Sequence, residues 1–163
     1  MIYRPYRPED FAALYAIEEA CFQPPLRFSR IYMRRLTGSA DAATWIAEEE
    51  GGAMAGFAIV EWSGEAVVSA YIQTIEVAPA KRRLGVGAEL MRRVEQSAQK
   101  AGAKAIWLHV DAENTGAIRL YEAHGYRREG KEANYYPRGR EALIYAKSLA
   151  RGKGFGWGIG ASG

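Results

Sequence analysis

The sequence predicts an α/β protein, because strand-like runs are followed by helix-like runs twice in its second half. The run 71–77 is rich in β-branched and aromatic residues and stops at Ala78-Pro79, as a strand does. Apolar residues then recur at helical spacing over 86–101. The same order returns with a strand-like run at 105–110 and a helix-like run at 114–125.

The first half of the chain supplies the other elements of the domain. Pro8 and two acidic residues open a helix that runs to Cys21, since proline and acids favour the first turn of a helix. Ser29 caps a second helix, and the pair Gly51-Gly52 marks a turn between strands. The remaining predicted strands are 2–7, 44–48, 55–62, 67–77, 126–132 and 142–148.

The turn between the strand at 71–77 and the helix at 86–101 has the composition of an anion-binding loop. It reads Arg82-Arg83-Leu84-Gly85-Val86-Gly87. Glycines let a ligand approach the backbone closely, and the first N–H groups of a helix are unpaired at the positive end of its dipole. The spacing fits neither a Walker loop nor the Gly-x-Gly-x-x-Gly fingerprint, because Leu90 stands where the third glycine would be. The loop indicates a pyrophosphate site, with an ordinary strand-to-helix turn as the alternative.

A second motif follows the strand at 105–110 and runs from Asn114 to Tyr126. Asn114 is a good helix N-cap, and Gly125 stands where a C-cap glycine belongs. The two motifs, in this order, resemble the GNAT superfamily of N-acetyltransferases, and the resemblance extends from Ile2 to about Leu149. It implies the GNAT fold, a mixed and mostly antiparallel central sheet of about seven strands with a splay between two central strands, flanked by about four helices.

The composition fits a single globular enzyme domain. The 163 residues are 48% hydrophobic and 25% charged, with a net charge of +3. The sequence has no apolar run of membrane-spanning length, and its N-terminus lacks the apolar core of a secretion signal. Cys21 has no cysteine partner, which fits a reducing cytoplasm, and we expect it to be a buried structural thiol. We predict the acetyltransferase domain at 1–149 and a flexible Gly-rich tail at 150–163.

The resemblance implies acetyl-CoA as the acetyl donor and no metal. The loop N–H groups would hold its pyrophosphate, and its pantetheine arm would pair with the strand that ends at Val77. Asn114 would contact the arm from the other side, and a backbone N–H near Ile75 would polarise the thioester carbonyl. The cofactor-binding residues expected on this basis are Ile75, Glu76, Val77, Arg82, Arg83, Leu84, Gly85, Val86, Gly87, Ala88, Asn114 and Tyr121.

Acetyl transfer to an amine requires a base, because an ammonium group has no lone pair. Of the two histidines, His109 shares a strand face with Trp107, and we expect it to be the general base, acting directly or through a water, with Tyr71 assisting. We expect His124, at a helix end, to be an exposed capping residue. The resemblance implies that Tyr121 protonates the departing thiolate. Structural packing is the alternative for all of these residues.

Two groups within the family resemble this chain. A branch of N-terminal protein acetyltransferases that uses a Tyr and a His as the base pair is similar to residues 71–75 and 108–110. The bacterial ribosomal-protein alanine acetyltransferases are similar around Asn134-Tyr135-Tyr136-Pro137 but carry a glutamate at the position of His109. The histidine can act as a base in place of the glutamate. The difference leaves open whether the substrate is a ribosomal protein.

Two loops are expected to bind the acceptor. In the resembling N-terminal acetyltransferases, these loops clamp the first residues of a peptide, with tyrosines on its backbone and apolar residues around its first side chain. The expected substrate-binding residues are Phe22, Pro24, Pro25, Leu26, Tyr71, Tyr135 and Tyr136. The alternative is that the prolines and tyrosines only stiffen their turns.

The sequence thus predicts an acetyl-CoA-dependent N-acetyltransferase that acts on the α-amine of a protein or peptide N-terminus, as a monomer or homodimer. A small amine or a lysine side chain as acceptor is the second interpretation. A non-catalytic acetyl-CoA-binding module is disfavoured by the presence of His109 and Tyr121. A nucleic-acid binder is disfavoured because aromatic residues are not interleaved with the arginine cluster.

Overall fold

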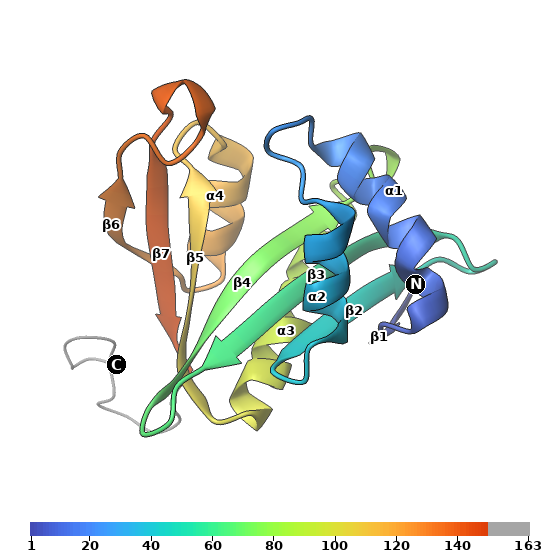
Figure 1. Cartoon of the computed structure of the whole chain (residues 1–163), viewed down its shortest axis with the longest axis horizontal. Coiled ribbons are helices and arrows are strands. Elements are labelled where there is room, and N and C mark those ends of the chain that lie inside the picture. The colour runs from blue at the N-terminus through green and yellow to red at the C-terminus, as the bar shows by residue number, and fades with distance from the viewer. Residues whose placement is uncertain (150–163) are drawn as a thin grey trace. The chain divides into compact units, whose positions relative to one another are not determined.

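The computed structural model describes residues 1–149, and the Gly-rich tail predicted at 150–163 lies outside the described residues (Figure 1). The described chain forms two compact units. Unit 1 contains Met1–Glu61 and Ile72–Ser97. Unit 2 contains Trp62–Tyr71 and the chain from Ala98 onward.

The helices and strands follow the order that the sequence predicts. The helices are α1 (Phe11–Cys21), α2 (Arg30–Gly38), α3 (Val86–Lys100) and α4 (Thr115–Ala123). The strands are β1 (Ile2–Pro5), β2 (Ala42–Glu48), β3 (Met54–Ser63), β4 (Val68–Val77), β5 (Ala103–Asp111), β6 (Arg127–Glu132) and β7 (Ala142–Ser148). Short 3-10 turns at Pro8–Asp10, Pro79–Lys81 and Pro137–Gly139 each begin at a proline, whose fixed φ suits the first position of a helical turn.

The strands form a seven-stranded sheet in the order β1-β2-β3-β4-β5-β7-β6. Antiparallel pairs join β1 to β2, β2 to β3, β5 to β7 and β6 to β7. β4 and β5 are parallel, and their pairing runs from Val68 opposite Ala103 to Tyr71 opposite Trp107. β4 then continues within unit 1 and β5 within unit 2. The predicted α/β class, with a mixed and mostly antiparallel sheet of seven strands and four helices within residues 1–149, is confirmed.

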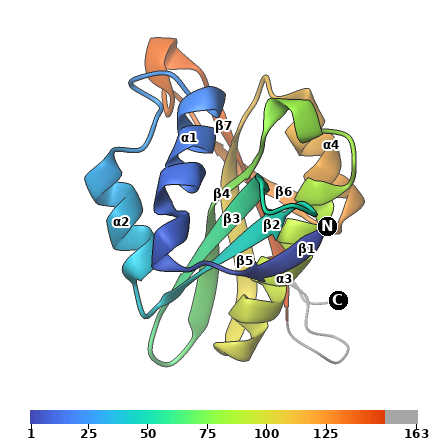
Figure 2. The same ribbon diagram turned by 90° about the vertical axis from the view of Figure 1, so that its right-hand side faces the viewer.

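Unit 1 packs helices against both faces of its strands. α1 and α2 lie on one face, and α3 lies on the other (Figure 2). The apolar stripe that predicted α3 is buried, as expected for a helix that covers a sheet. The side chains buried between α1, α2 and the strands include Leu14, Met33, Leu36, Ile46 and Phe57, each with 0% of its surface exposed.

β3 and β4 approach each other closely at Gly56. A Cβ atom at this position would lie 2.5 Å from the carbonyl oxygen of Glu76 and 3.2 Å from the Cα atom of Val77. Both neighbours are backbone atoms, so only glycine fits there without a shift of the strand. The close approach fixes the strand segment that the sequence predicts to bind the donor.

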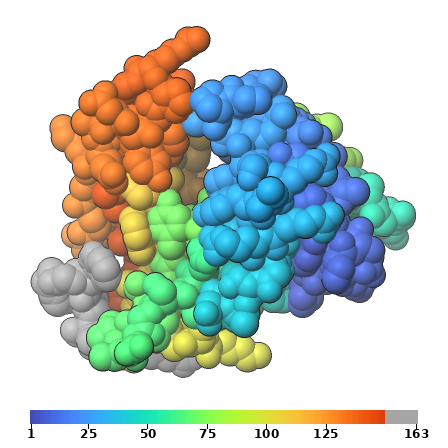
Figure 3. Space-filling model, viewed as in Figure 1, coloured from blue at the N-terminus to red at the C-terminus, as the bar shows by residue number. Residues whose placement is uncertain are grey.

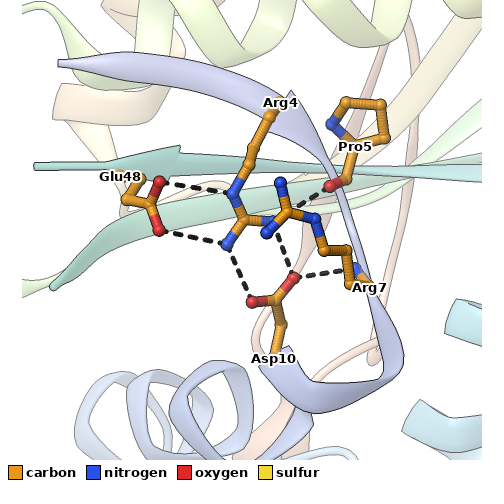
Figure 4. A network of polar contacts seen from close by, with 5 residues as sticks. All are labelled: Arg4, Pro5, Arg7, Asp10 and Glu48. Carbon is orange, nitrogen blue, oxygen red and sulfur yellow. Dashed lines mark hydrogen bonds and ion pairs between the residues drawn. The ribbon is translucent and has the colours of Figure 1, made fainter. Parts of the chain in front are cut away.

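An ion-pair network ties the start of the chain to β2 (Figure 4). Two guanidinium nitrogens of Arg4 each donate to an oxygen of Asp10 at 2.8 Å, and Arg4 also pairs with Glu48 at 3.2 Å. The backbone N–H of Arg7 donates to the same carboxylate at 2.7 Å. The hydrogen bonds from Arg4 lower the pKa of Asp10, which is 8% exposed. The network therefore holds β1, the first 3-10 turn and β2 together.

Asp10→Ala should lower the free energy of unfolding by about 1–3 kcal/mol at pH 7, because it removes a buried partner of Arg4. Because the folded-state pKa of Asp10 is lowered, its contribution is present above the unfolded value of about 3.9 and is lost as the pH falls through the folded value. Urea unfolding at pH 7 and at about pH 2.5, below the unfolded value, measures both effects. Lys131→Ala, in an exposed pair with Glu141, is the control and should change stability by less than about 0.5 kcal/mol. Equal losses in the two variants would contradict the prediction.

Unit 2 is built on β5, with β7 beside it and β6 beyond β7 (Figure 1). Ile106, Leu108 and Val110 of β5 are buried, as the alternation of a strand requires. The hydroxyl of Tyr145 on β7 donates to a carboxylate oxygen of Glu122 on α4 at 2.6 Å. This bond fastens α4 to the strands.

Three predicted helix caps are confirmed. The Ser29 hydroxyl accepts from the Tyr32 N–H at 3.1 Å and begins α2. The Asn114 side chain accepts from the Ala117 N–H at 3.2 Å and begins α4. Gly125 follows α4 with a φ of +90°, a conformation that favours glycine.

Four predicted details are wrong. β1 ends at Pro5, because Arg7 is already the N-cap of the first 3-10 turn. Tyr126 precedes β6 and is buried against α4, at a ring-centroid distance of 5.7 Å from Tyr121. Cys21 is half-buried, because it ends α1. His124 is half-buried, because its ring Nδ1 donates to the Leu120 carbonyl at 2.9 Å.

Candidate active site

Unit 2 gathers an aromatic cluster around His109. Trp107 and His109 lie on the same face of β5, two residues apart, with ring centroids 5.4 Å apart. Tyr71 pairs with Trp107 across the β4–β5 ladder, and its ring lies edge-on to the indole at 4.6 Å. The structure thus brings together the two side chains predicted to act as the base.

Both ring nitrogens of His109 are engaged. Nδ1 lies 2.8 Å from the Tyr71 hydroxyl, and Nε2 lies 2.8 Å from a carboxylate oxygen of Glu132. A carboxylate can only accept, so Nε2 carries the hydrogen of the neutral ring and donates it. Nδ1 therefore presents its lone pair and accepts from the Tyr71 O–H.

Tyr135 covers the imidazole. The ring of Tyr135 is stacked on that of His109, with centroids 4.2 Å apart and an angle of 12° between the planes. The His109 side chain is 10% exposed, whereas Tyr135 is 42% exposed. An imidazole enclosed in this way is screened from bulk water and held in one orientation.

The loop that carries Tyr135 is anchored at both sides. The Tyr136 N–H donates to the Arg140 carbonyl at 3.0 Å, and the Arg140 guanidinium donates to the carboxylate of Asp111 at the end of β5. A Cβ atom at Gly139, where φ is +74°, would lie 2.9 Å from the side-chain oxygen of Asn134. The loop therefore depends on glycine and on an ion pair with β5.

Tyr121 is buried in unit 2 and carries its proton at neutral pH. Burial raises the pKa of its hydroxyl to about 12. The pKa of Tyr136 is also raised to about 12, by burial first and by Tyr135 second. A protonated phenol can donate a proton to a thiolate, so the chemical state of Tyr121 suits the predicted role.

The turn after β4 in unit 1 has the backbone of an anion site. Arg83 and Gly85 both have positive φ, at 68° and 79°, and α3 begins at Val86. Left-handed residues next to a helix start let consecutive N–H groups point toward one ligand. Arg83 and Gly85 are exposed, and nothing lies within 4 Å of a Cβ atom built on Gly85. These residues fit a pyrophosphate.

Arg82, the other arginine of the loop, forms contacts with other residues of unit 1. Nε of Arg82 donates to the Val77 carbonyl at 3.0 Å, and its terminal nitrogen lies 3.3 Å from the Cys21 sulfur. The exposed guanidinium of Arg82 therefore has a fixed position beside the loop. On α4, the side-chain oxygen of Asn114 serves as the helix cap, which leaves the amide nitrogen as the donor for a ligand.

The side chain of Glu76 points into unit 1 and meets Glu18 of α1. Both residues are buried, with 3% and 1% of their surface exposed. Thr74 donates to Glu76 at 2.7 Å, and the Phe28 N–H donates to Glu18 at 2.9 Å. Burial, and then hydrogen bonding to Glu18, raises the pKa of Glu76. Glu76 therefore offers a cofactor only its backbone groups.

The predicted acceptor loop of unit 1 is a tight turn at the surface. Figure 3 shows this loop (blue) and α2 (lighter blue) on the face in view. The Gln23 carbonyl accepts from the Leu26 N–H at 2.9 Å, and Arg27 donates to the Phe22 carbonyl at 3.0 Å. Pro24, Pro25 and Leu26 are exposed, and Phe22 is half-buried. Phe22–Leu26 belong to unit 1, whereas Tyr135 and Tyr136 belong to unit 2.

The sequence placed Trp107 on the strand face of His109, but it did not identify Glu132 as a member of the His109 cluster. The alternation of β5 was the signal for Trp107, because it places residues 107 and 109 on one face. Glu132 carried no signal, because its approach to His109 requires β6 to lie beyond β7.

The fold and these residues define an acetyltransferase. The model of the acetyltransferase (GNAT) family matches residues 11–126, and the chain belongs to this family. It is 36% identical over 104 residues to the [ribosomal protein bS18]-alanine N-acetyltransferase of Escherichia coli strain K12, which covers 62% of this chain and 68% of that protein. It is 37% identical over 97 residues to the streptothricin acetyltransferase of Streptomyces lavendulae, which covers 60% of this chain and 51% of that protein. The predicted family is confirmed.

A solved structure agrees with the sequence relatives. The crystal structure of the ribosomal-protein-S18-alanine N-acetyltransferase from Escherichia coli matches with a TM-score of 0.81 at 26% identity, over 93% of this chain and 95% of that chain. Within residues 1–149, no helix has the length and apolar character needed to cross a membrane. In the same range, His, Cys, Asp and Glu side chains form no group of three or more placed to hold a metal ion.

Glu76→Gln should stabilise the protein at alkaline pH. Because the folded-state pKa of Glu76 is raised to about 10, stability is greatest below the unfolded value of about 4.3 and is lost as the pH rises toward the folded value. The glutamine variant removes this loss and should gain about 1–3 kcal/mol at pH 8, with a flatter dependence on pH. Urea unfolding between pH 5 and pH 9 measures the gain. Glu129→Gln on β6 is the control, and the same pH slope in both variants would refute the assignment.

Proposed function

We propose that this chain transfers the acetyl group of acetyl-CoA to the α-amine of a protein or peptide N-terminus. The observation that carries the proposal is the hydrogen-bonded pair of Tyr71 and His109 beneath the exposed ring of Tyr135. Membership of the acetyltransferase family and the 36% identity to an alanine N-acetyltransferase support it. A cytoplasmic location and a monomeric or homodimeric state stay predictions.

Acetyl-CoA, when bound, supplies an activated thioester. In unit 1, the residues proposed to hold it are the turn after β4 and the backbone of Ile75–Val77. In unit 2, Asn114 and Tyr121 are the residues proposed to contact it. The turn has the positive φ values and the helix start that a pyrophosphate requires. A backbone N–H near Ile75 would stabilise the oxyanion that develops during acyl transfer.

Tyr71 and His109 would remove the proton of the acceptor ammonium. The amine proton passes to the hydroxyl oxygen of Tyr71, directly or through a water, while the Tyr71 proton passes to Nδ1 of His109. This order follows from the tautomer, because the lone pair of Nδ1 already accepts from the Tyr71 O–H. Tyr121 holds the proton that the leaving thiolate requires.

The acceptor would be a peptide rather than an isolated amine. Tyr135 and Tyr136 present hydroxyl groups that can bond a peptide backbone, and their loop is anchored by Arg140 and Gly139. The exposed apolar turn of Pro24, Pro25 and Leu26, beside Phe22, would contact the first side chain.

A small amine is the second candidate acceptor. The observation that favours it is the 37% identity to a streptothricin acetyltransferase. The distinction rests on the acceptor loops, because donor binding and proton transfer would be shared by both reactions.

Transfer from labelled acetyl-CoA to a library of peptides with free N-termini and one internal lysine each tests the acceptor. Label on α-amines, with a preference for certain first residues, is the expected result. Label only on lysine, or only on streptothricin added in parallel, would overturn the N-terminal assignment. Mass spectrometry of the products identifies the modified atom.

His109→Gln should lower kcat by about 10²–10⁴-fold, because it removes the final proton acceptor. Tyr71→Phe should lower kcat by a smaller factor, since a water can bridge the amine and His109. Steady-state rates at saturating acetyl-CoA measure both. His124→Gln is the matched control and should keep wild-type rates, because His124 only caps α4. Wild-type kcat in His109→Gln would exclude it as the base.

The double change Tyr135→Phe and Tyr136→Phe should raise the peptide KM by about 3–10-fold and leave the acetyl-CoA KM unchanged. Each hydroxyl would contribute one hydrogen bond to the peptide backbone. Initial rates at varied peptide and fixed acetyl-CoA give the value. An unchanged peptide KM would remove both hydroxyls from the acceptor site, and Tyr32→Phe on α2 controls for loss of a tyrosine hydroxyl elsewhere.

A further inference from the structure

Glu132 is the carboxylate that engages the ring of His109. It lies at the end of β6, and its side chain is 54% exposed, whereas the His109 side chain is 10% exposed. The Oε1 atom is 2.8 Å from Nε2 of the ring. The bond reaches over β7, which lies between β5 and β6 in the sheet.

We propose that Glu132 is a positioning residue that fixes the tautomer of His109 for proton transfer. Its carboxylate keeps the hydrogen on Nε2 and leaves the lone pair of Nδ1 directed at the Tyr71 hydroxyl. This inference rests on the proposed function of Tyr71 and His109 as the base pair.

The direction of the proton relay depends on this tautomer. A neutral imidazole carries its hydrogen on either nitrogen, and the partner of one nitrogen decides the state of the other. With the hydrogen on Nδ1, the ring would donate to the Tyr71 oxygen and could not accept its proton. With the hydrogen on Nε2, the proton of Tyr71 has an open acceptor.

The relay balances with Glu132 in place. One proton moves from the acceptor ammonium to the Tyr71 oxygen, and the original Tyr71 proton moves to Nδ1 of His109. The product is a neutral amine, an unchanged Tyr71 and an imidazolium whose Nε2–H still donates to the Glu132 carboxylate. The positive charge then forms beside a negative one, which favours the transfer.

Among the residues that the structure describes, the other neighbours of His109 contact the ring elsewhere than at Nε2. Tyr71 occupies Nδ1, and the Tyr135 and Trp107 rings contact the imidazole through their faces and edges. The carboxylate of Asp111, two residues along β5, is paired with Arg140.

Nitrogen NMR of the imidazole rings tests the proposal without an acceptor. The chain contains two histidines, so the His124→Gln variant assigns both rings in ¹⁵N-histidine-labelled protein. In the neutral state, wild type and Glu132→Gln should show the hydrogen of His109 on Nε2, because the glutamine oxygen still accepts. Glu132→Ala should show the hydrogen shared between the two nitrogens, while Glu129→Ala, on the same strand, should match wild type.

Rates complete the test. Glu132→Ala should lower kcat by about 10-fold or more with both KM values unchanged, and Glu132→Gln should retain more activity than Glu132→Ala. An unchanged tautomer in Glu132→Ala, or a changed tautomer with wild-type kcat, would overturn the proposal. The NMR result stands even where no peptide is acetylated, so a failure of the proposed acceptor is distinguishable from a failure of the positioning role.

Discussion

The parallel pairing of β4 with β5 is the constraint on which the candidate site depends. Parallel neighbours cannot be joined by a tight hairpin, so the chain leaves β4 at its carboxyl end and returns through α3. This crossover places the turn with Arg83 and Gly85 at the start of a helix, where an anion is favoured. The register also sets Tyr71 opposite Trp107, on the face of β5 that carries His109.

β4 is held by polar as well as apolar contacts. Two buried carboxyl groups would repel each other if both were ionised, and burial, with Glu18 beside it, raises the pKa of Glu76. The pair joins α1 to the carboxyl-terminal part of β4, and Gly56 lets β3 approach the same segment from its other edge. A protein that binds a ligand along exposed strand backbone requires that the strand stay in place without the ligand.

Local signals in the sequence predicted most of the elements. β7 was predicted at 142–148 and is found there, and α3 was predicted at 86–101 and ends at Lys100. Periodicity and capping residues act within a few positions, so they can be read from one sequence. The bond between Glu132 and His109 depends on the order of β5, β7 and β6, which no local pattern contains. A buried acid such as Glu18 is also indistinguishable in sequence from an exposed one.

In the loop that carries Tyr135 and Tyr136, the residues that fix the backbone differ from the two tyrosines themselves. Asn134, Gly139 and Arg140 set the backbone through a close contact and an ion pair, whereas Tyr135 is exposed and Tyr136 is half-buried. The ring of Tyr135, however, is also stacked on His109. Under the proposed function, an evolutionary change of acceptor through position 135 would therefore alter the stacking contact on His109 at the same time. Position 136 is linked to the same cluster, because the ring of Tyr136 lies edge-on to that of Tyr135 at a centroid distance of 4.9 Å.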